Sequence, residues 1–409
     1  MSHWTEFGIR RLPPMSARSR VVEIPPPIQA EIDKRFPLLK HPLTGISTGG
    51  VPTAGLFPLH STGVSTAPIA EAAQAFLSAL DAAARAKAQL PLDADEWRTW
   101  LNVHMNFFRH GVMLEDLPVT TRQLALDLVR ATLSARGYGL ARDIMRLNEL
   151  LAELTGSPDE YGEWPYFVTV FGDPSSGAPW GWQIDGHHLV VNCVVVDDNL
   201  VLTPTFMGSE PCHVHEGPLA GTEVFVAEER AGLDLVRSLD EVQAARAILR
   251  PSIHPDDLPL DMQHPFDGRM VAGAFNDNAV IGHEGVAARD FSDAQRQLLR
   301  SLVGGYVGWT RDGHAEVKMA EVEAHLDDTW FSWMGATGEK GPFYYRVHSP
   351  VVLIEFDHHP GVVFDNKEPS RNHVHTIVRT PNGGDYGADL LRQHHERYDH
   401  SHGHHDPRS

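Results

Sequence analysis

Apolar residues recur at helical spacing between residues 67 and 156. Three segments, 67–88, 120–137 and 138–156, carry this pattern, and Gly156 supplies a stop for the last of them. The residues that form the 3.6-residue stripe in that last segment are Leu140, Ile144, Leu147, Leu151 and Leu154. The pattern therefore predicts a helical layer over residues 67–156.

Beyond Gly156 the pattern becomes typical of strands. The segments WPYFVTVFG, LVVNCVVVDDNLVLTPTF and PFYYRVHSPVVLIEFD are rich in Val, Phe and Tyr and are bounded by Gly, Pro and Asp. Within the second segment we expect a hairpin whose turn is formed by Asp197, Asp198 and Asn199.

Two further helices are expected to interrupt these strands. Each opens with a capping box, Ser238 with Glu241 in the first and Ser292 with Gln295 in the second. Helices that come first and strands that come later, with few strand–helix–strand alternations, favour an α+β fold. We therefore expect an N-terminal helical layer packed on a largely antiparallel β-sheet.

The two ends of the chain differ from the middle in composition. Residues 1–66 are rich in Pro, Gly, Ser and Thr, which predicts an irregular arm that wraps the body. Residues 67–400 are expected to form a single α+β domain, helical over 67–156 and mixed over 157–400. Residues 401–409 are His-rich and expected to be disordered, and they are set aside because such tails bind divalent metals nonspecifically.

Histidine is the most unusual feature of the composition, with 25 in the chain. In SRNHVHTIVR, a strand would place His373 and His375 on one face together with Arg371 and Arg379. Two imidazoles that project the same way are a common beginning of a metal site. A flanking arginine can hold the carboxylate or phosphate of a substrate. The alternative interpretation is the solvent-exposed polar face of an edge strand.

A turn and a C-terminal helix are predicted after this strand, and the helix is expected to close the His-rich site. The helix would begin at Tyr386, so that either His394 or His395 faces the sheet behind the strand. Asp385 at its start is more typical of an N-cap than of a ligand. A histidine on the apolar side of a helix is also commonly a packed, hydrogen-bonded residue, so a structural role for His395 stays open.

A second pair of histidines, His187 and His188, lies at the mouth of a strand that is apolar on both faces. A buried imidazole there must find a partner, either as a metal ligand or as a hydrogen-bond donor to a ligand. Because neighbours on a strand point to opposite faces, we expect at most one of the two to join a given site.

Two other segments contain candidate ligands. Cys212, His213 and His215 in SEPCHVHEG are typical of a soft-metal loop, although a surface loop with incidental histidines fits equally well. Glu355 and Asp357 share a strand face in IEFDHHPG. Either carboxylate would complete a site of two histidines and one carboxylate, the pattern of non-haem iron oxygenases.

Composition and charge narrow the classes of function. The net charge of −20 argues against nucleic-acid and membrane partners. Two cysteines cannot build a disulfide framework, and we find no apolar leader or spanning run, so we expect a cytoplasmic protein. Dinucleotide-binding, Walker, GxSxG and HExxH motifs are all missing from the sequence.

The chain resembles the family known as domain of unknown function 3500, from about Val64 to His400. The resemblance rests on segments such as WGWQIDGHHLVVN, FYYRVHSPVVLIEFD and HVHTIVRTPNGGDYGADLLRQHHERYDH. It implies an enzymatic family, without naming a substrate. It also implies that one site is shared by His187, His188, His373, His375, Arg379, Asp385, Tyr386, Gly387 and His395.

Three hypotheses follow. The first is an iron- or copper-dependent oxidoreductase or oxygenase that acts on a small, anionic organic molecule. Its ligands would be His373, His375 and one of His187, His188 or His395, with Arg379 orienting the substrate and Tyr386 or Asp385 tuning the ligands. The second is a zinc hydrolase or lyase with Glu355 or Asp357 as base; manganese is a further alternative metal. The third is a non-catalytic metal- or ligand-binding protein.

Overall fold

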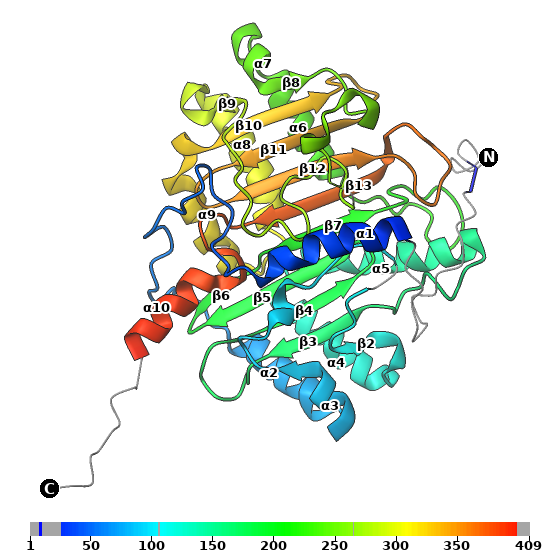
Figure 1. Ribbon diagram of the computed structural model, residues 1–409, viewed down its shortest axis with the longest axis vertical. Helices are drawn as coiled ribbons and strands as arrows, with labels where there is room; N and C mark the ends of the chain where they lie inside the picture. Colours follow the sequence, from blue (N-terminus) through cyan, green and yellow to red (C-terminus); the bar gives the residue numbers. More distant parts are fainter. Residues whose placement is uncertain (1–7, 10–25, 105–106, 265, 399–409) are drawn as a thin grey trace, which may run out of the picture.

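One large β-sheet runs through the middle of the protein, as the face-on view in Figure 1 shows. The computed structural model describes residues 8–9, 26–104, 107–264 and 266–398. Over these residues the sheet has 13 strands, and its main path is β1-β3-β4-β5-β7-β13-β12-β11-β10-β8. Neighbours are antiparallel except in the pairs β1–β3 and β10–β8. The predicted α+β fold with a largely antiparallel sheet is thus confirmed. The strands are β1 (Gln89–Leu90), β2 (Val112–Met113), β3 (Phe167–Phe171), β4 (Trp180–Gly186), β5 (Leu189–Val196), β6 (Asn199–Val201), β7 (Thr205–Ser209), β8 (Ile248–Arg250), β9 (Val286–Ala287), β10 (Trp330–Gly335), β11 (Phe343–His348), β12 (Leu353–His359) and β13 (Ser370–Arg379).

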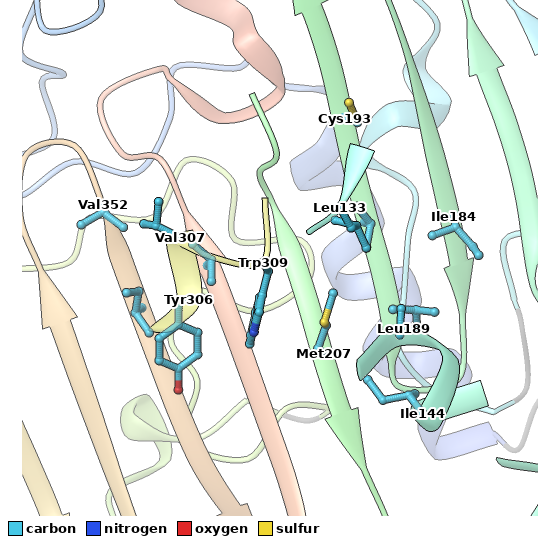
Figure 2. Packing of buried hydrophobic residues seen from close by; sticks show 14 of the residues in the cluster. Leu133, Ile144, Ile184, Leu189, Cys193, Met207, Tyr306, Val307, Trp309 and Val352 are labelled. Atoms are coloured by element: carbon cyan, nitrogen blue, oxygen red, sulfur yellow. The ribbon is translucent and has the colours of Figure 1, made fainter. Parts of the chain in front are cut away.

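Helices supply most of the cover on one face of the sheet. Their apolar stripes and the inward-facing strand residues form the largest core cluster of the protein, part of which Figure 2 shows between Met207 and Leu189 on the strands and Ile144 and Trp309 from the helical layer. The helices are α1 (Pro26–Arg35), α2 (Ala67–Ser78), α3 (Ala82–Ala88), α4 (Val119–Thr132), α5 (Ala135–Thr155), α6 (Val226–Arg237), α7 (Glu241–Ala247), α8 (Asp293–Val307), α9 (His314–Ala324) and α10 (Ala388–Tyr398). Four of them, α2 to α5, lie in the predicted helical segment.

Irregular segments cover the other face. A second core cluster there joins Ile377 and Phe206 of the sheet to Trp100 and to apolar residues of the loop around Met270. Leu39, which follows α1, also belongs to it. The face that carries His373 and His375 is therefore covered by loops, whose side chains reach the strands without the regular spacing of a helix.

The ends of the helices confirm some sequence signals and correct one. Gly156 ends α5 in the left-handed conformation, with φ of 67°. Ser292 and Gln295 form the predicted capping box of α8. The other predicted box is wrong: α7 begins two residues later than expected, because Asp240 caps it, whereas the Ser238 hydroxyl bonds to a carbonyl at the end of α6.

The N-terminal arm is not irregular throughout, because α1 lies within it. After α1 the chain is largely without regular structure, and it is tied to the body by backbone bonds from Ser47 to the loop near Ala279. The predicted disordered tail falls outside the described residues. Among the described helices none has the length and apolarity that a membrane span requires.

Candidate metal centre

Three buried histidines, His188, His373 and His375, come together with one ring nitrogen of each within 4.8 Å of the others. The Nε2 atom of His375 lies 3.1 Å from that of His373 and 3.2 Å from that of His188. Two nitrogens bonded to one metal ion at about 2.0–2.1 Å lie about 2.9–3.4 Å apart when the bonds subtend about 90–110°. Two of the three distances between these nitrogens are therefore those of a ligand set, and the group could hold a metal ion.

The sheet register brings His375 to His188. Across the ladder, His375 of β13 pairs with Gly208 of β7 on one side and with Asp357 of β12 on the other. The backbone carbonyl of His188 accepts a hydrogen bond from the Gly208 amide at 2.8 Å. Gly208 thus lies between the two histidines, and a Cβ at this position would lie 3.0 Å from Cδ2 of the His375 ring. The absence of a side chain lets the two imidazoles meet.

His187 and His188 form the two-residue turn of the β4–β5 hairpin, in which Gly186 pairs with Leu189. His188 adopts a left-handed conformation with φ of 59°, which is uncommon for a residue other than Gly, Asn or Asp. The two rings consequently stack, with centroids 4.0 Å apart. The expectation that the two side chains point to opposite faces is wrong, because it assumed a strand where the chain makes a turn.

Hydrogen bonds orient the ring of His373. Its Nδ1 atom lies 2.7 Å from the Pro360 carbonyl oxygen, so Nδ1 carries the proton and Nε2 presents a lone pair to the cluster. The Glu210 carboxylate lies 3.8 Å from the same Nδ1 atom. Glu210 itself accepts backbone N–H bonds from residues 362–364, which holds the loop that contains Pro360.

Two histidines of the cluster, His188 and His375, are biased toward the neutral form. Burial first, and then the neighbouring histidines, hold the pKa of His188 and of His375 well below the usual value for histidine. Neutral imidazoles are the form that binds metals. Exposure rises from 1% for His373 to 3% for His375 and 6% for His188, so the His188 side of the cluster is nearest to solvent.

His359 packs on the cluster, although we did not predict it. Its ring centroid lies 3.9 Å from that of His375, and its Nε2 atom lies 2.9 Å from Asp357. The β12–β13 register shifts between His358 and His359, so consecutive residues no longer alternate simply between faces. No sequence pattern marks this irregularity.

Neither predicted carboxylate belongs to the three-histidine group. Asp357 pairs with Arg269; burial alone would raise its pKa, but Arg269 and His359 bring it below the usual value. Glu355 accepts the Tyr344 hydroxyl and the backbone amides of residues 271 and 272. Both carboxylates lie on the predicted strand face, but their oxygens are committed to other donors.

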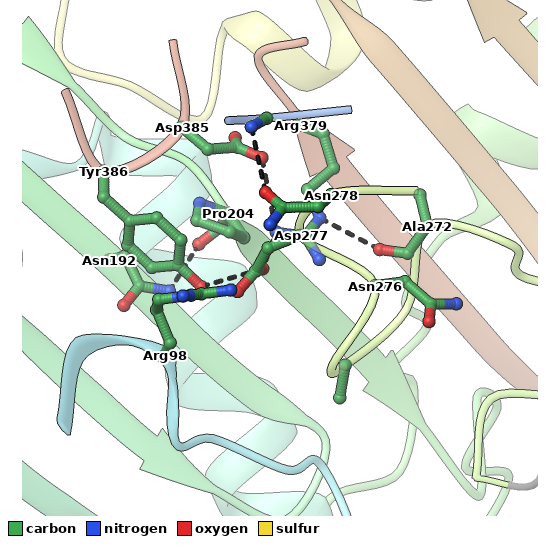
Figure 3. A network of polar contacts seen from close by, with 12 residues as sticks. Arg98, Asn192, Pro204, Ala272, Asn276, Asp277, Asn278, Arg379, Asp385 and Tyr386 are labelled. Atoms are coloured by element: carbon green, nitrogen blue, oxygen red, sulfur yellow. Dashed lines mark hydrogen bonds and ion pairs between the residues drawn. The ribbon is translucent and has the colours of Figure 1, made fainter. Parts of the chain in front are cut away.

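Arg379, Asp385 and Tyr386 form a separate buried network, which Figure 3 shows. The Arg379 guanidinium, fully buried, bonds to Asp277 at 2.9 Å and to Asp385 at 3.3 Å, and to two backbone carbonyls. The Tyr386 hydroxyl bonds to Asp277 and to Trp100. Asp385 accepts the Thr380 amide and is not an N-cap of α10. This arrangement favours a structural role for Arg379 over the contact with a substrate that we expected.

The remaining candidate histidines lie elsewhere. His395 is exposed on α10, and its ring lies near that of His394 rather than near the three-histidine group. Its position therefore does not support the ligand role that we expected, because the side chain turns to solvent. His213 lies 4.0 Å from Glu223 at the surface and is not part of the group either. Cys212 is free and buried.

Two loop residues, His104 and Tyr161, lie next to His187, whose ring stacks on that of His188. The rings of His104 and Tyr161 lie 5.7 Å and 5.6 Å from that of His187. Sequence reasoning missed both, since neither is part of a ligand-like spacing. His104 does occur in DEWRTWLNVH, a segment that carries the family resemblance.

The fold and the site define an α+β protein with one extended sheet and a buried group of three histidines able to hold a metal ion. The chain belongs to the family described as "Protein of unknown function (DUF3500)", whose model matches residues 62–388. Neither the search of curated proteins nor that of solved structures finds a match. Any conclusion about the reaction must therefore come from the site.

Proposed function

We propose that this protein is a metal-dependent oxidoreductase or oxygenase, in which His188, His373 and His375 bind an iron or copper ion and a small organic molecule reacts at the open side of that ion. One observation carries the proposal: the convergence of three buried imidazole nitrogens at the spacing of metal ligands. Three protein ligands leave coordination positions for oxygen and substrate.

The surroundings favour redox chemistry over hydrolysis. A zinc hydrolase needs a general base that is free to take a proton from the metal-bound water. The two carboxylates that we expected in this role are engaged, Asp357 by Arg269 and Glu355 by Tyr344 and backbone amides. Iron and copper activate oxygen at the metal itself, so their chemistry does not require such a base beside the ligands.

The test is elemental analysis of the full chain in a background without the C-terminal histidines. Replacing His400, His402, His404 and His405 by alanine removes nonspecific binding by the tail. A His373→Ala/His375→Ala variant is then compared with a His394→Ala/His395→Ala control, whose histidines lie on α10 outside the three-histidine group.

We expect near-stoichiometric iron or copper in the parent and in the control, and its loss in the His373→Ala/His375→Ala variant. Oxygen-consumption assays with small organic acids then search for the substrate. Zinc that is lost in the same pattern would overturn the redox assignment in favour of a hydrolase or lyase. Protein that neither retains nor rebinds any metal would overturn the metal site altogether.

A further inference from the structure

The three-histidine group continues into a second triangle of rings. The ring centroids of His104, Tyr161 and His187 lie 5.1, 5.6 and 5.7 Å apart. The corresponding distances within the His188, His373 and His375 group are 4.8, 5.0 and 5.3 Å. The stacked pair of His187 and His188 joins the two triangles. Two groups of similar size and composition thus lie side by side.

Two polar atoms of the second triangle are buried and have no hydrogen-bond partner in the described structure: Nε2 of His104 and the hydroxyl of Tyr161. His104 is 6% exposed and Tyr161 is 1% exposed. An unsatisfied buried polar group is destabilising, so such atoms generally belong with a ligand, an ion or a water. Tyr166, which is also buried nearby, shows the contrast, because its hydroxyl bonds to the His187 carbonyl at 3.0 Å.

His187 is held as a metal-binding histidine is commonly held. Its Nδ1 atom lies 2.7 Å from the Oδ1 atom of Asn148, and the amide nitrogen of Asn148 donates to the Gly162 carbonyl. Nδ1 therefore carries the proton and Nε2 carries a lone pair. His373 is oriented in the same way by the Pro360 carbonyl.

We propose that His104, Tyr161 and His187 form a second metal position beside the first, which holds an iron(III) or copper(II) ion through two imidazole nitrogens and a phenolate oxygen. Binding breaks the O–H bond of Tyr161 and forms a metal–oxygen bond, and the proton passes to the buffer without electron transfer. The inference rests on the proposed function, since it makes the centre of that enzyme dinuclear.

The test is a titration of metal-free full-length protein, in the background without tail histidines, with copper(II) and separately with iron(III). We expect two equivalents to bind and a phenolate-to-metal charge-transfer band to appear in the visible spectrum. Tyr161→Phe should abolish the band and remove one equivalent. His375→Ala should remove one equivalent and keep the band. The matched control is Tyr138→Phe, at a half-buried tyrosine of α5 whose ring is covered by the Arg130 guanidinium, and it should change neither.

The outcomes separate the two proposals. If the parent protein binds one equivalent without a charge-transfer band, and His375→Ala binds none, the second metal position is overturned and the first remains. Two equivalents with an unchanged titration of Tyr161→Phe would overturn it as well. No binding of either metal would overturn both. The spectrum of the parent protein needs no substitution, so a variant that folds poorly does not prevent the decision.

Discussion

Gly208→Ala is a perturbation that tests the metal centre without touching a ligand. The added Cβ would lie 2.7 Å from the Val374 carbonyl oxygen and 3.0 Å from Cδ2 of His375. Ordinary van der Waals contacts begin at 3.4 Å, so β13 and the His375 ring must move by about 0.4 Å or more. Metal–ligand distances tolerate only about 0.2 Å. We therefore expect His375 to lose its place in the ligand set.

Two magnitudes follow from this displacement. Overpacking should lower the free energy of unfolding by about 1–3 kcal/mol. The affinity for metal should fall by about 10–100-fold, as it does when the orientation of a ligand is disturbed. The assay is a competition titration with a chelator of known affinity, and unfolding in denaturant gives the stability change.

Gly232→Ala is the matched control for Gly208→Ala. On α6, its added Cβ would lie 2.5 Å from the Tyr345 ring, which gives comparable overpacking away from the histidines. We expect it to lose stability and to keep its metal affinity. Equal metal affinities for the Gly208 variant and the parent protein would refute the idea that Gly208 sets the spacing of His375 and His188.

Three further predictions concern the surroundings of the site. Arg379→Met should lower the free energy of unfolding by about 3–5 kcal/mol, because Asp385 would remain buried without a cation. The metal content should not change, and a loss of metal at unchanged stability would contradict this. Burial raises the pKa of Asp267 to about 7, so the native state holds a proton that the unfolded state releases near 3.8. Relative to Asp267→Asn, the free energy of unfolding of the wild type should therefore fall by about 3 kcal/mol as the pH rises from 4 to 7. Asp267→Asn should lack this decline, and identical pH profiles in denaturant unfolding would exclude it. Glu210→Gln replaces one acceptor oxygen with an NH2 donor that faces the backbone N–H groups of residues 362–364. The loop that contains Pro360 should then hold His373 less firmly, and metal affinity should fall about 10-fold or more in chelator competition. An unchanged affinity would mean that this loop does not orient His373.

Strand alternation was enough to find His373 and His375, because both residues and their apolar neighbours obey the two-residue period of β13. The same rule puts Arg379 on that face as well, but its guanidinium has other partners, Asp277 and Asp385. A shared face is not a shared site: Arg379 lies four positions beyond His375, which is about 13 Å along the strand. At that distance Arg379 meets the loop around Asp277 instead of the histidines.

The position of His188 depends on information that the local pattern does not contain. The segment after His188 is apolar on both faces, which predicts a buried strand. This pattern does not show which residues form the turn before that strand. The meeting of His188 and His375 also requires β7 to lie between β5 and β13, and it requires a glycine at the crossing. His104 and Tyr161 come from loops, where no periodicity exists to be read.

The arrangement of the histidines in this part of the core could hold a cation. The Nε2 atoms of His188, His373 and His375 face one another in a buried space, and a proton on one of them can bridge only one pair at a time. Protonation is disfavoured because burial and the neighbouring imidazoles lower the pKa of His188 and His375. Apolar side chains would fill the same space at lower cost. A bound metal ion would satisfy all three nitrogens together, with His373 oriented by its hydrogen bond to the Pro360 carbonyl and His375 brought close by the missing side chain at Gly208.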